Sequence, residues 1–241
     1  MSETIKIQQN FSMFKLNLNR NALLALLLLV PVPSIGVATQ LYMLPGLKGH
    51  LVALLSKIWM LVLPIIWLLF IDKENLKAEY PKRRDLLAGV GLGLLMLCIM
   101  LIVYWLLGAK WIDVEYVRDR ATQVGLDSFV VYLVGSAYWI FVNSLLEEFV
   151  WRRFVYRQCE ILVSSPLAVI LSALFFTIHH IVGLAAYFDW RATTLCSLGV
   201  FLAGAIWSWC YLNYCSIWPG YISHIFADIA IFLIGWQLIF A

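Results

Sequence analysis

Long runs of apolar residues, separated by short clusters of charged residues, recur along the whole chain. A helix needs about 20 residues to cross about 30 Å of hydrocarbon. Seven runs reach that length: Ala22 to Leu44, Leu51 to Ile71, Leu86 to Gly108, Phe129 to Gln158, Pro166 to Tyr187, Thr193 to Asn213 and Ile217 to Phe240. The pattern predicts an all-α fold, a polytopic membrane helix bundle. The fourth run is long and contains charges, so part of it projects from the bilayer or lines a wet cavity, and an eighth helix is the alternative.

Two stretches need separate interpretation. Pro31 and Pro33 interrupt the first run, but apolar residues resume after them, so we expect a kinked membrane anchor; a cleaved signal peptide is the alternative. The stretch Lys110–Asp127 mixes acidic and basic side chains, which is typical of an interfacial helix. No internal repeat is evident. We therefore expect a single transmembrane domain over residues 1–241, with a motif-bearing catalytic core over 129–240.

The composition supports a membrane protein and excludes other classes. Hydrophobic residues make up 63% of the chain and charged residues 13%, with a mean hydropathy of +0.88. Soluble domains carry about 25% charged residues. The net charge of +3 is too small for a nucleic-acid binder, and no basic stripe with interleaved aromatic residues occurs. The five cysteines form no C-x-x-C pair, so we interpret them as small hydrophobic residues.

Basic residues are distributed unequally between the two ends of the predicted helices. Of the 17 Lys and Arg residues, 11 lie on the side of the N-terminus and 6 on the other, where Lys57 is expected to extend its ammonium out along its helix. The larger group is Lys6, Lys15, Arg20, Lys73, Lys77, Lys82, Arg83, Arg84, Arg152, Arg153 and Arg157. Because basic loops stay in the cytoplasm, we expect a cytoplasmic N-terminus and an external Ala241. The expected location is a bacterial cytoplasmic membrane.

Charged residues inside apolar runs mark candidate sites, because a charge at the bilayer centre costs roughly 2.5–3.5 kcal/mol on insertion scales. The fourth run holds Glu147, Glu148, Arg152 and Arg153. Glu148 and Arg152 have the i, i+4 spacing that allows an ion pair on one helical face. Glu147 points about 100° away and lacks that partner, which suits a general base. The alternative is a purely structural, positively charged end of a helix.

Histidines mark two more candidate sites. His179 and His180 lie in the fifth run, and His224 and Asp228 share one face of the last run at i, i+4 spacing. By helix rise, Glu147, His180 and His224 lie roughly 10 to 20 Å from the same membrane face. We therefore expect one shared cavity that is open to the cytoplasm. For each histidine taken alone, a structural hydrogen bond is the alternative.

These motifs, in this order, resemble those of the CPBP intramembrane proteases, which include type II CAAX prenyl endopeptidases and the Abi or bacteriocin-immunity proteins. The family pattern E-E-x-x-x-R is matched by Glu147-Glu148 with Arg152, F-x-x-x-H by Phe176 with His180 or by Phe175 with His179, and H-x-x-x-N/D by His224 with Asp228. The resemblance covers about a third of the chain. In the family, glycine commonly follows the motif arginine, whereas this chain has Arg153.

The resemblance implies a role for each motif residue. Glu147 would activate the attacking water, with Glu148 and Arg152 in support. His180 and His224 would bind the water or the oxyanion, and His179 is the alternative to His180. Asp228 stands where asparagine is often found, and a carboxylate fits a metal ligand or a histidine orienter better than an oxyanion donor.

The same residues leave open whether the site holds a metal ion. A divalent metal such as zinc could be held by His180, His224 and Glu147, although the zinc-protease pattern H-E-x-x-H is absent. Water activated by glutamate without a metal is the other possibility.

We therefore expect an intramembrane endopeptidase that hydrolyses membrane-associated or prenylated, CAAX-like peptides. Its partners would be a peptide or lipidated protein substrate and membrane lipid, with no nucleic acid. The main alternative is a non-catalytic bacteriocin self-immunity or membrane scaffold protein. A proton-coupled transporter, in which buried Glu and His residues relay protons, is a further alternative. Transporters often have repeated halves, and none is found here.

Overall fold

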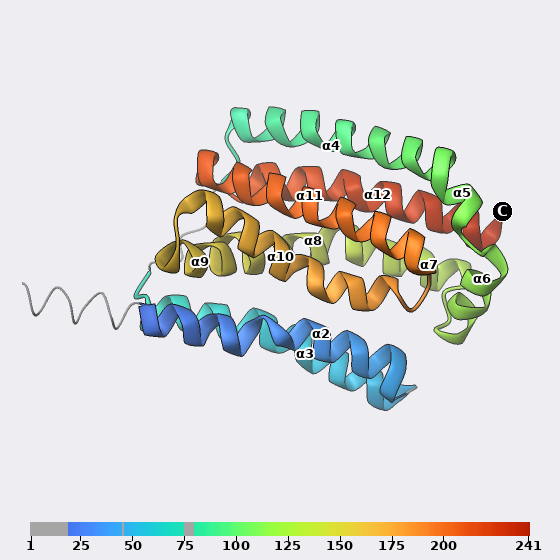
Figure 1. Cartoon of the computed structure of the whole chain (residues 1–241), viewed down its shortest axis with the longest axis horizontal. Helices are drawn as coiled ribbons and strands as arrows, with labels where there is room; N and C mark the ends of the chain where they lie inside the picture. The colour runs from blue at the N-terminus through green and yellow to red at the C-terminus, as the bar shows by residue number, and fades with distance from the viewer. Residues whose placement is uncertain (1–18, 45, 75–79) are drawn as a thin grey trace, which may run out of the picture.

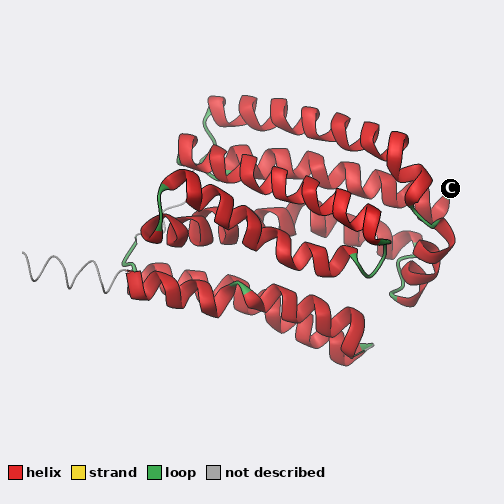
Figure 2. Ribbon diagram, in the orientation of Figure 1, coloured by secondary structure: helices red, strands yellow, loops and turns green. Residues whose placement is uncertain are grey.

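The computed structural model describes residues 19–44, 46–74 and 80–241. Within these ranges the regular structure is entirely helical (Figure 2). Among the described residues, seven helices are long and apolar enough to cross a membrane: Asn19–Met43, Leu47–Ile71, Arg83–Trp111, Phe129–Leu162, Ser165–Leu184, Trp190–Tyr214 and Trp218–Phe240. The predicted all-α membrane bundle is confirmed, with seven spans. Each predicted boundary lies within a few residues of the observed one.

Several spans combine α-helical and π-helical segments. The first contains helical residues 19–29, α2 (Pro31–Ala38) and η1 (Thr39–Met43), and the second contains α3 (Leu47–Ile66) and η2 (Trp67–Ile71). The third contains α4 (Arg83–Val103), η3 (Tyr104–Gly108) and α5 (Ala109–Trp111). The fourth contains α7 (Phe129–Ala137), η4 (Tyr138–Asn143), α8 (Ser144–Glu148), η5 (Phe149–Tyr156) and α9 (Arg157–Leu162). The last three are α10 (Ser165–Leu184), α11 (Trp190–Tyr214) and α12 (Trp218–Phe240).

The helices lie roughly parallel to one long axis, with α4 along one edge of the bundle and the α2–α3 pair along the opposite edge (Figure 1). Along their lengths α12 packs against α4 and α10 against α11. The α4–α12 contact requires glycine, because a Cβ at Gly89 or Gly93 would collide with Ile222 or Phe226. The fourth span contacts α3 as well as α10, α11 and α12.

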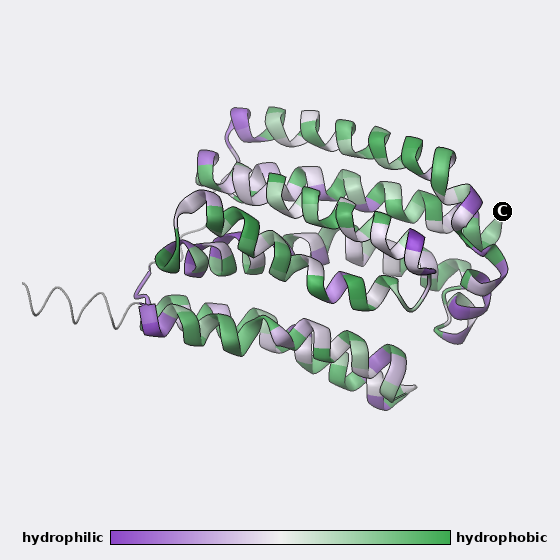
Figure 3. Cartoon of the chain, in the orientation of Figure 1, coloured by the Kyte–Doolittle hydropathy of each residue, from purple (hydrophilic) through white to green (hydrophobic). Residues whose placement is uncertain are grey.

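The two ends of the bundle differ in the segments they present. The N-terminal end holds the start of the first span and the turn at 163–164, and the far end holds residues 124–128, residues 185–189 and the C-terminus (Figure 1). Hydrophilic residues concentrate at both ends, whereas the helix sides are mostly hydrophobic (Figure 3). Many large apolar side chains on those sides are exposed. Such a surface is stable only when lipid covers it.

At the far end, the stretch predicted to be an interfacial helix contains the helix α6 (Val114–Gln123). The Asp113 carboxylate accepts the Tyr116 backbone N–H and so caps its first turn. Val117 packs against Leu238 of α12, and Arg118 Nε donates to the Leu238 carbonyl at 2.9 Å. These contacts fix α6 against the C-terminal helix.

The fourth span is the longest, with 34 residues. At 1.5 Å per residue it measures about 51 Å, which exceeds the hydrocarbon thickness of about 30 Å. Two π-helical segments, η4 and η5, flank the short α8 that carries Glu147 and Glu148. Wider π-helical turns inside α-helices are frequent at functional sites. The sequence pattern gave no indication of them.

Candidate active site

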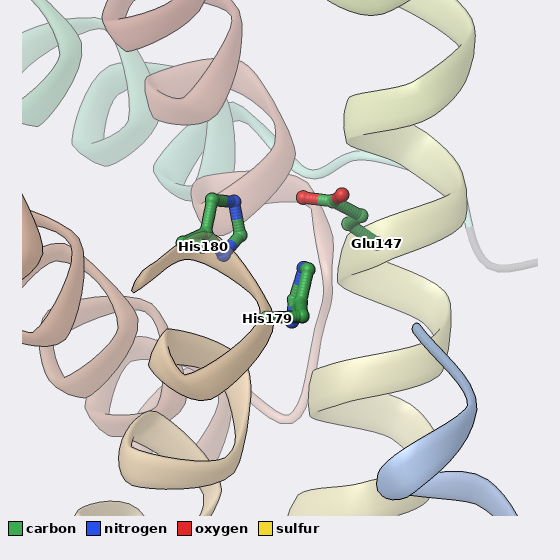
Figure 4. A group of neighbouring side chains, drawn as sticks. All are labelled: Glu147, His179 and His180. Carbon is green, nitrogen blue, oxygen red and sulfur yellow. The ribbon is translucent and has the colours of Figure 1, made fainter. Parts of the chain in front are cut away.

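All seven residues singled out in the sequence come from three neighbouring helices. Glu147, Glu148 and Arg152 lie in the fourth span, His179 and His180 in α10, and His224 and Asp228 in α12. Figure 4 shows the Glu147 carboxylate pointing from its helix toward the two histidines of α10. Residues far apart in the sequence therefore meet inside the bundle.

The ion pair expected between Glu148 and Arg152 is present and fully buried. Arg152 Nη1 lies 3.1 Å from Glu148 Oε1, with side-chain exposures of 1% and 0%. The guanidinium also lies over the Phe176 and Trp207 rings, at 4.7 and 5.0 Å from their centroids. Its Nη2 donates to the Gly204 carbonyl at 3.3 Å. These contacts compensate a charge that lipid could not solvate.

Glu148 also orients His224. His224 Nδ1 lies 3.1 Å from Glu148 Oε1, and since a carboxylate only accepts, Nδ1 carries the proton. The imidazole stacks on the Trp207 ring, at 4.1 Å between centroids. Its other nitrogen, Nε2, then lies 3.8 Å from Glu147 Oε2 and 3.8 Å from Asp228 Oδ1. His224 Nε2 is thus directed toward Glu147.

The close approach of α12 to Glu148 depends on a residue without a side chain. A Cβ built at Gly220 would overlap Glu148 Oε2 and lie 3.1 Å from Glu148 Cδ. A carboxylate held by Arg152 and His224 cannot move away cheaply. Only glycine at this position allows the first turn of α12 to bring His224 to the ion pair.

Asp228 makes a different contact from the one that its spacing suggests. Its Oδ2 accepts the Ser144 hydroxyl at 2.7 Å, whereas the 3.8 Å distance to His224 Nε2 is too long for a hydrogen bond. The hydrogen-bond partner that orients the His224 ring is Glu148. Asp228 contributes a nearby negative charge and ties α12 to α8.

Glu147 is buried, with 6% of its surface exposed. Its Oε1 accepts a hydrogen bond from Asn143 Nδ2 at 3.0 Å, and its Oε2 faces His224. Glu147 makes no ion pair with Arg152 among the described residues, as the helical spacing predicted. One oxygen is therefore held by a neutral donor and the other faces the histidines.

The two histidines of α10 are held in different ways. His180 Nδ1 lies 2.8 Å from the Phe176 carbonyl, which can only accept, so in the neutral ring Nε2 is left with a lone pair. His179 stacks on Trp151, with nearly parallel rings and centroids 5.3 Å apart. Its buried Nδ1 has no hydrogen-bond partner in the part of the chain that the structure describes.

Glu147, His179 and His180 also form a group of possible metal ligands. One ligand atom from each lies within 4.8 Å of the others (Figure 4). The set predicted from the sequence contained His224 in place of His179, and His224 Nε2 lies 3.8 Å from Glu147 Oε2.

Arg153, which stands at the position where the family often has glycine, turns away from the buried pair. Its Nη2 lies 3.5 Å from Glu74 Oε2, and Arg157 lies 3.8 Å from the same carboxylate. The side chain at this position therefore forms its ion pair at the N-terminal end of the bundle.

Three of the lysines that contributed to the predicted orientation lie outside the described residues: Lys6, Lys15 and Lys77.

Two residues next to Glu147, Lys57 and Asn143, were not predicted from the sequence as site residues. Lys57 does not extend out along its helix as predicted: its ammonium donates to Asn143 Oδ1 and lies 3.8 Å from the centroid of the Trp139 ring. Asn143 is buried, with 3% of its surface exposed. Two features of the sequence could have indicated them as site residues. Lys57 lies within an apolar run, and Asn143 lies one helical turn before the glutamate pair.

A cavity of about 350 Å³ lies beside Glu147, between the α2–α3 pair and the fourth span. Its lining includes Glu147 and His179, and continues to His50, Val124 and Tyr187. Burial raises the pKa of the Tyr187 hydroxyl, which keeps it a neutral donor. His180 and His224 do not belong to the lining.

The direction of this cavity differs from the prediction of an opening at the cytoplasmic, N-terminal end. Val124 and Tyr187 lie at the far end of the bundle. His180 is near the C-terminus of α10, whose last residue is Leu184, whereas His224 is in the second turn of α12, near the opposite end of the bundle. Depth along the helices therefore does not determine at which end the cavity opens.

Comparison with known proteins agrees with this geometry. The family model described as type II CAAX prenyl endopeptidase Rce1-like matches residues 129–230, a range that contains all three motifs. No curated protein and no solved structure matches the chain. The match over residues 129–230 supports an assignment of this part of the chain to the CPBP/CAAX family of intramembrane proteases.

Proposed function

We propose that this protein is an intramembrane endopeptidase that cleaves prenylated or otherwise membrane-associated peptides with a water molecule activated by Glu147. The observation that carries the proposal is the position of Glu147. Its carboxylate is buried in a membrane-spanning helix, faces histidines from two other helices and lines a cavity. A buried carboxylate without an arginine partner is expensive in a membrane, which favours a functional role.

In the proposed reaction, Glu147 Oε2 takes a proton from a water molecule, whose oxygen attacks the scissile carbonyl carbon. The lone pair on His180 Nε2 helps to orient that water. His224 Nε2, when protonated, donates a hydrogen bond to the oxyanion that forms. Glu147 then returns its proton to the leaving amine. The buried Glu148–Arg152 pair positions His224 throughout.

The same site fits a divalent metal such as zinc. Two imidazoles and a carboxylate are common zinc ligands, and the buried His179 Nδ1 lacks another partner among the described residues. Glu147, His179 and His180 would hold the ion. When bound, it would supply Lewis-acid polarisation of the scissile carbonyl.

The test is peptide cleavage by the purified, full-length protein in lipid nanodiscs. A prenylated CAAX-like peptide and the same peptide without the prenyl group are incubated with the protein, and the products are identified by mass spectrometry. We expect cleavage of the prenylated peptide. Loss of cleavage with a chelator and its recovery with zinc would indicate a metal-dependent reaction. No product from either peptide or from a pooled library of membrane-proximal peptides would contradict the proposed function.

The orientation in the membrane decides from which side substrate reaches the cavity. The excess of basic residues at the N-terminal end supports a cytoplasmic N-terminus. The cavity extends toward the opposite end, past Val124 and Tyr187. In this orientation the substrate enters from the non-cytoplasmic side.

Cysteine labelling checks this arrangement. In a background in which the exposed Cys98 and Cys215 are replaced by serine, we expect Val124→Cys to react with a membrane-impermeant maleimide in intact cells. The control, Arg84→Cys, lies near the other end of the bundle and should react only after permeabilisation. The reverse pattern would place the cavity mouth in the cytoplasm.

A further inference from the structure

A lysine from the second span reaches the interior of the bundle beside the site. Lys57 of α3 is half-buried, and its Nζ donates to Asn143 Oδ1. The ammonium lies 3.8 Å from the centroid of the Trp139 ring and 5.7 Å from that of Tyr138. A hydrogen bond and two aromatic faces thus replace the water that the ammonium loses on burial.

This contact decides which way the Asn143 amide points. An ammonium can only donate and a carboxylate can only accept, whereas an amide does both. With Oδ1 toward Lys57, Nδ2 donates to Glu147 Oε1 at 3.0 Å. A flipped amide would direct N–H groups at the ammonium and oxygen at the carboxylate. Lys57 therefore holds Asn143 in the one orientation that gives Glu147 a donor.

The fixed amide in turn fixes the Glu147 carboxylate. Oε1 is occupied by Asn143, so Oε2 is the atom that faces His224 Nε2, at 3.8 Å. We propose that Lys57 and Asn143 form a positioning relay that holds the Glu147 carboxylate in its reactive orientation. This inference rests on the proposed role of Glu147 as the base. Neither Lys57 nor Asn143 belongs to the three motifs.

The relay also joins two parts of the bundle. Lys57 belongs to the α2–α3 pair, and Asn143 and Glu147 belong to the fourth span, and all three line the cavity. A shift of α3 would withdraw the ammonium and free the Asn143 amide to rotate. The orientation of Glu147 is therefore coupled to the position of the cavity wall.

Kinetics of single and double variants test the relay. Misplaced catalytic groups and lost supporting contacts cost about 10- to 100-fold in rate. We expect Lys57→Met to lower kcat by about that factor with KM nearly unchanged. Asn143→Leu should have a similar effect, and the double variant should lose little more, because both residues act through Glu147. Lys57→Arg, which also only donates, should recover most of kcat.

The matched control is Lys48→Met, an exposed lysine on the same helix, which should leave kcat unchanged. If Lys57→Met folds poorly, Lys57→Gln tests the same point, since its amide no longer dictates the orientation of Asn143. Unchanged kcat in the Lys57 variants, an effect on KM alone, or fully additive losses would overturn the relay. In each case the wild type still cleaves, so the proposed function stands.

A second readout does not depend on cleavage. Dicyclohexylcarbodiimide modifies buried carboxyl groups, and mass spectrometry can follow its reaction at Glu147. We expect faster modification in Lys57→Met and Asn143→Leu than in the wild type or Lys48→Met, because Oε1 loses its hydrogen bond. Equal rates in all four proteins would overturn the relay, whatever the substrate proves to be.

Discussion

Replacing Glu147 with glutamine is expected to lower kcat by about 10²- to 10⁴-fold, the usual contribution of a general base. Glutamine has nearly the same shape but cannot take a proton from water. Its carbonyl oxygen can still accept the hydrogen bond that Asn143 Nδ2 donates to Glu147 at 3.0 Å. The local packing is therefore preserved while the proposed chemistry is removed.

The measurement is the cleavage rate of a prenylated peptide in nanodiscs, together with the thermal unfolding midpoint. Glu160→Gln is a matched control on the same span, because Tyr156 and Ser165 donate to Glu160 Oε1 and a glutamine oxygen can replace it. We expect wild-type rates for this control. Wild-type activity in Glu147→Gln would exclude Glu147 as the base.

Replacing Arg152 with methionine is expected to destabilise the protein by about 3–5 kcal/mol, the usual cost of breaking a buried ion pair. Glu148 has an exposure of 0% and would keep a carboxylate without its guanidinium partner. The same change removes the hydrogen bond to Gly204 and the contacts with the Phe176 and Trp207 rings. His224, which bonds to Glu148, would also lose its position.

Unfolding of the purified variants measures this effect. The double variant with Glu148→Gln and Arg152→Met carries no buried charge at this place and should recover a large part of the lost stability. The neighbouring Arg153→Met is the control, since its ion pair with Glu74 is more exposed and such pairs contribute about 0–1 kcal/mol. Equal stability of Arg152→Met and the wild type would mean that the pair is not a structural requirement.

The seven spans and the three motifs could be predicted from the sequence, because each depends on local information. Membrane insertion responds to apolar length, and the observed spans follow it. The i, i+4 spacing placed Glu148 beside Arg152, and the pair is present at 3.1 Å. Helical geometry alone also separated Glu147 from that pair. These predictions needed no knowledge of which helices are neighbours.

The contacts between helices were decided by the tertiary structure. Lys57 lies within an apolar helix, so the sequence suggested that its ammonium extends out of the membrane. In the bundle, α3 packs beside the fourth span, and Asn143 offers a hydrogen-bond acceptor to this ammonium. His224 and Asp228 suggested a local pair, yet Gly220 lets α12 approach Glu148 closely enough for His224 to bond there instead.

The end of the bundle at which the cavity opens was also decided by the packing of the helices. Distance along a helix gives the depth of Glu147, but it does not say at which end the neighbouring helices separate. Hydrophobic length and helical periodicity are properties of one segment, so the spans and the faces of the motif helices could be derived from the sequence. Hydrogen bonds, ion pairs and cavities form between segments, so only the packed bundle decided how Glu147 is held and from which end it is reached.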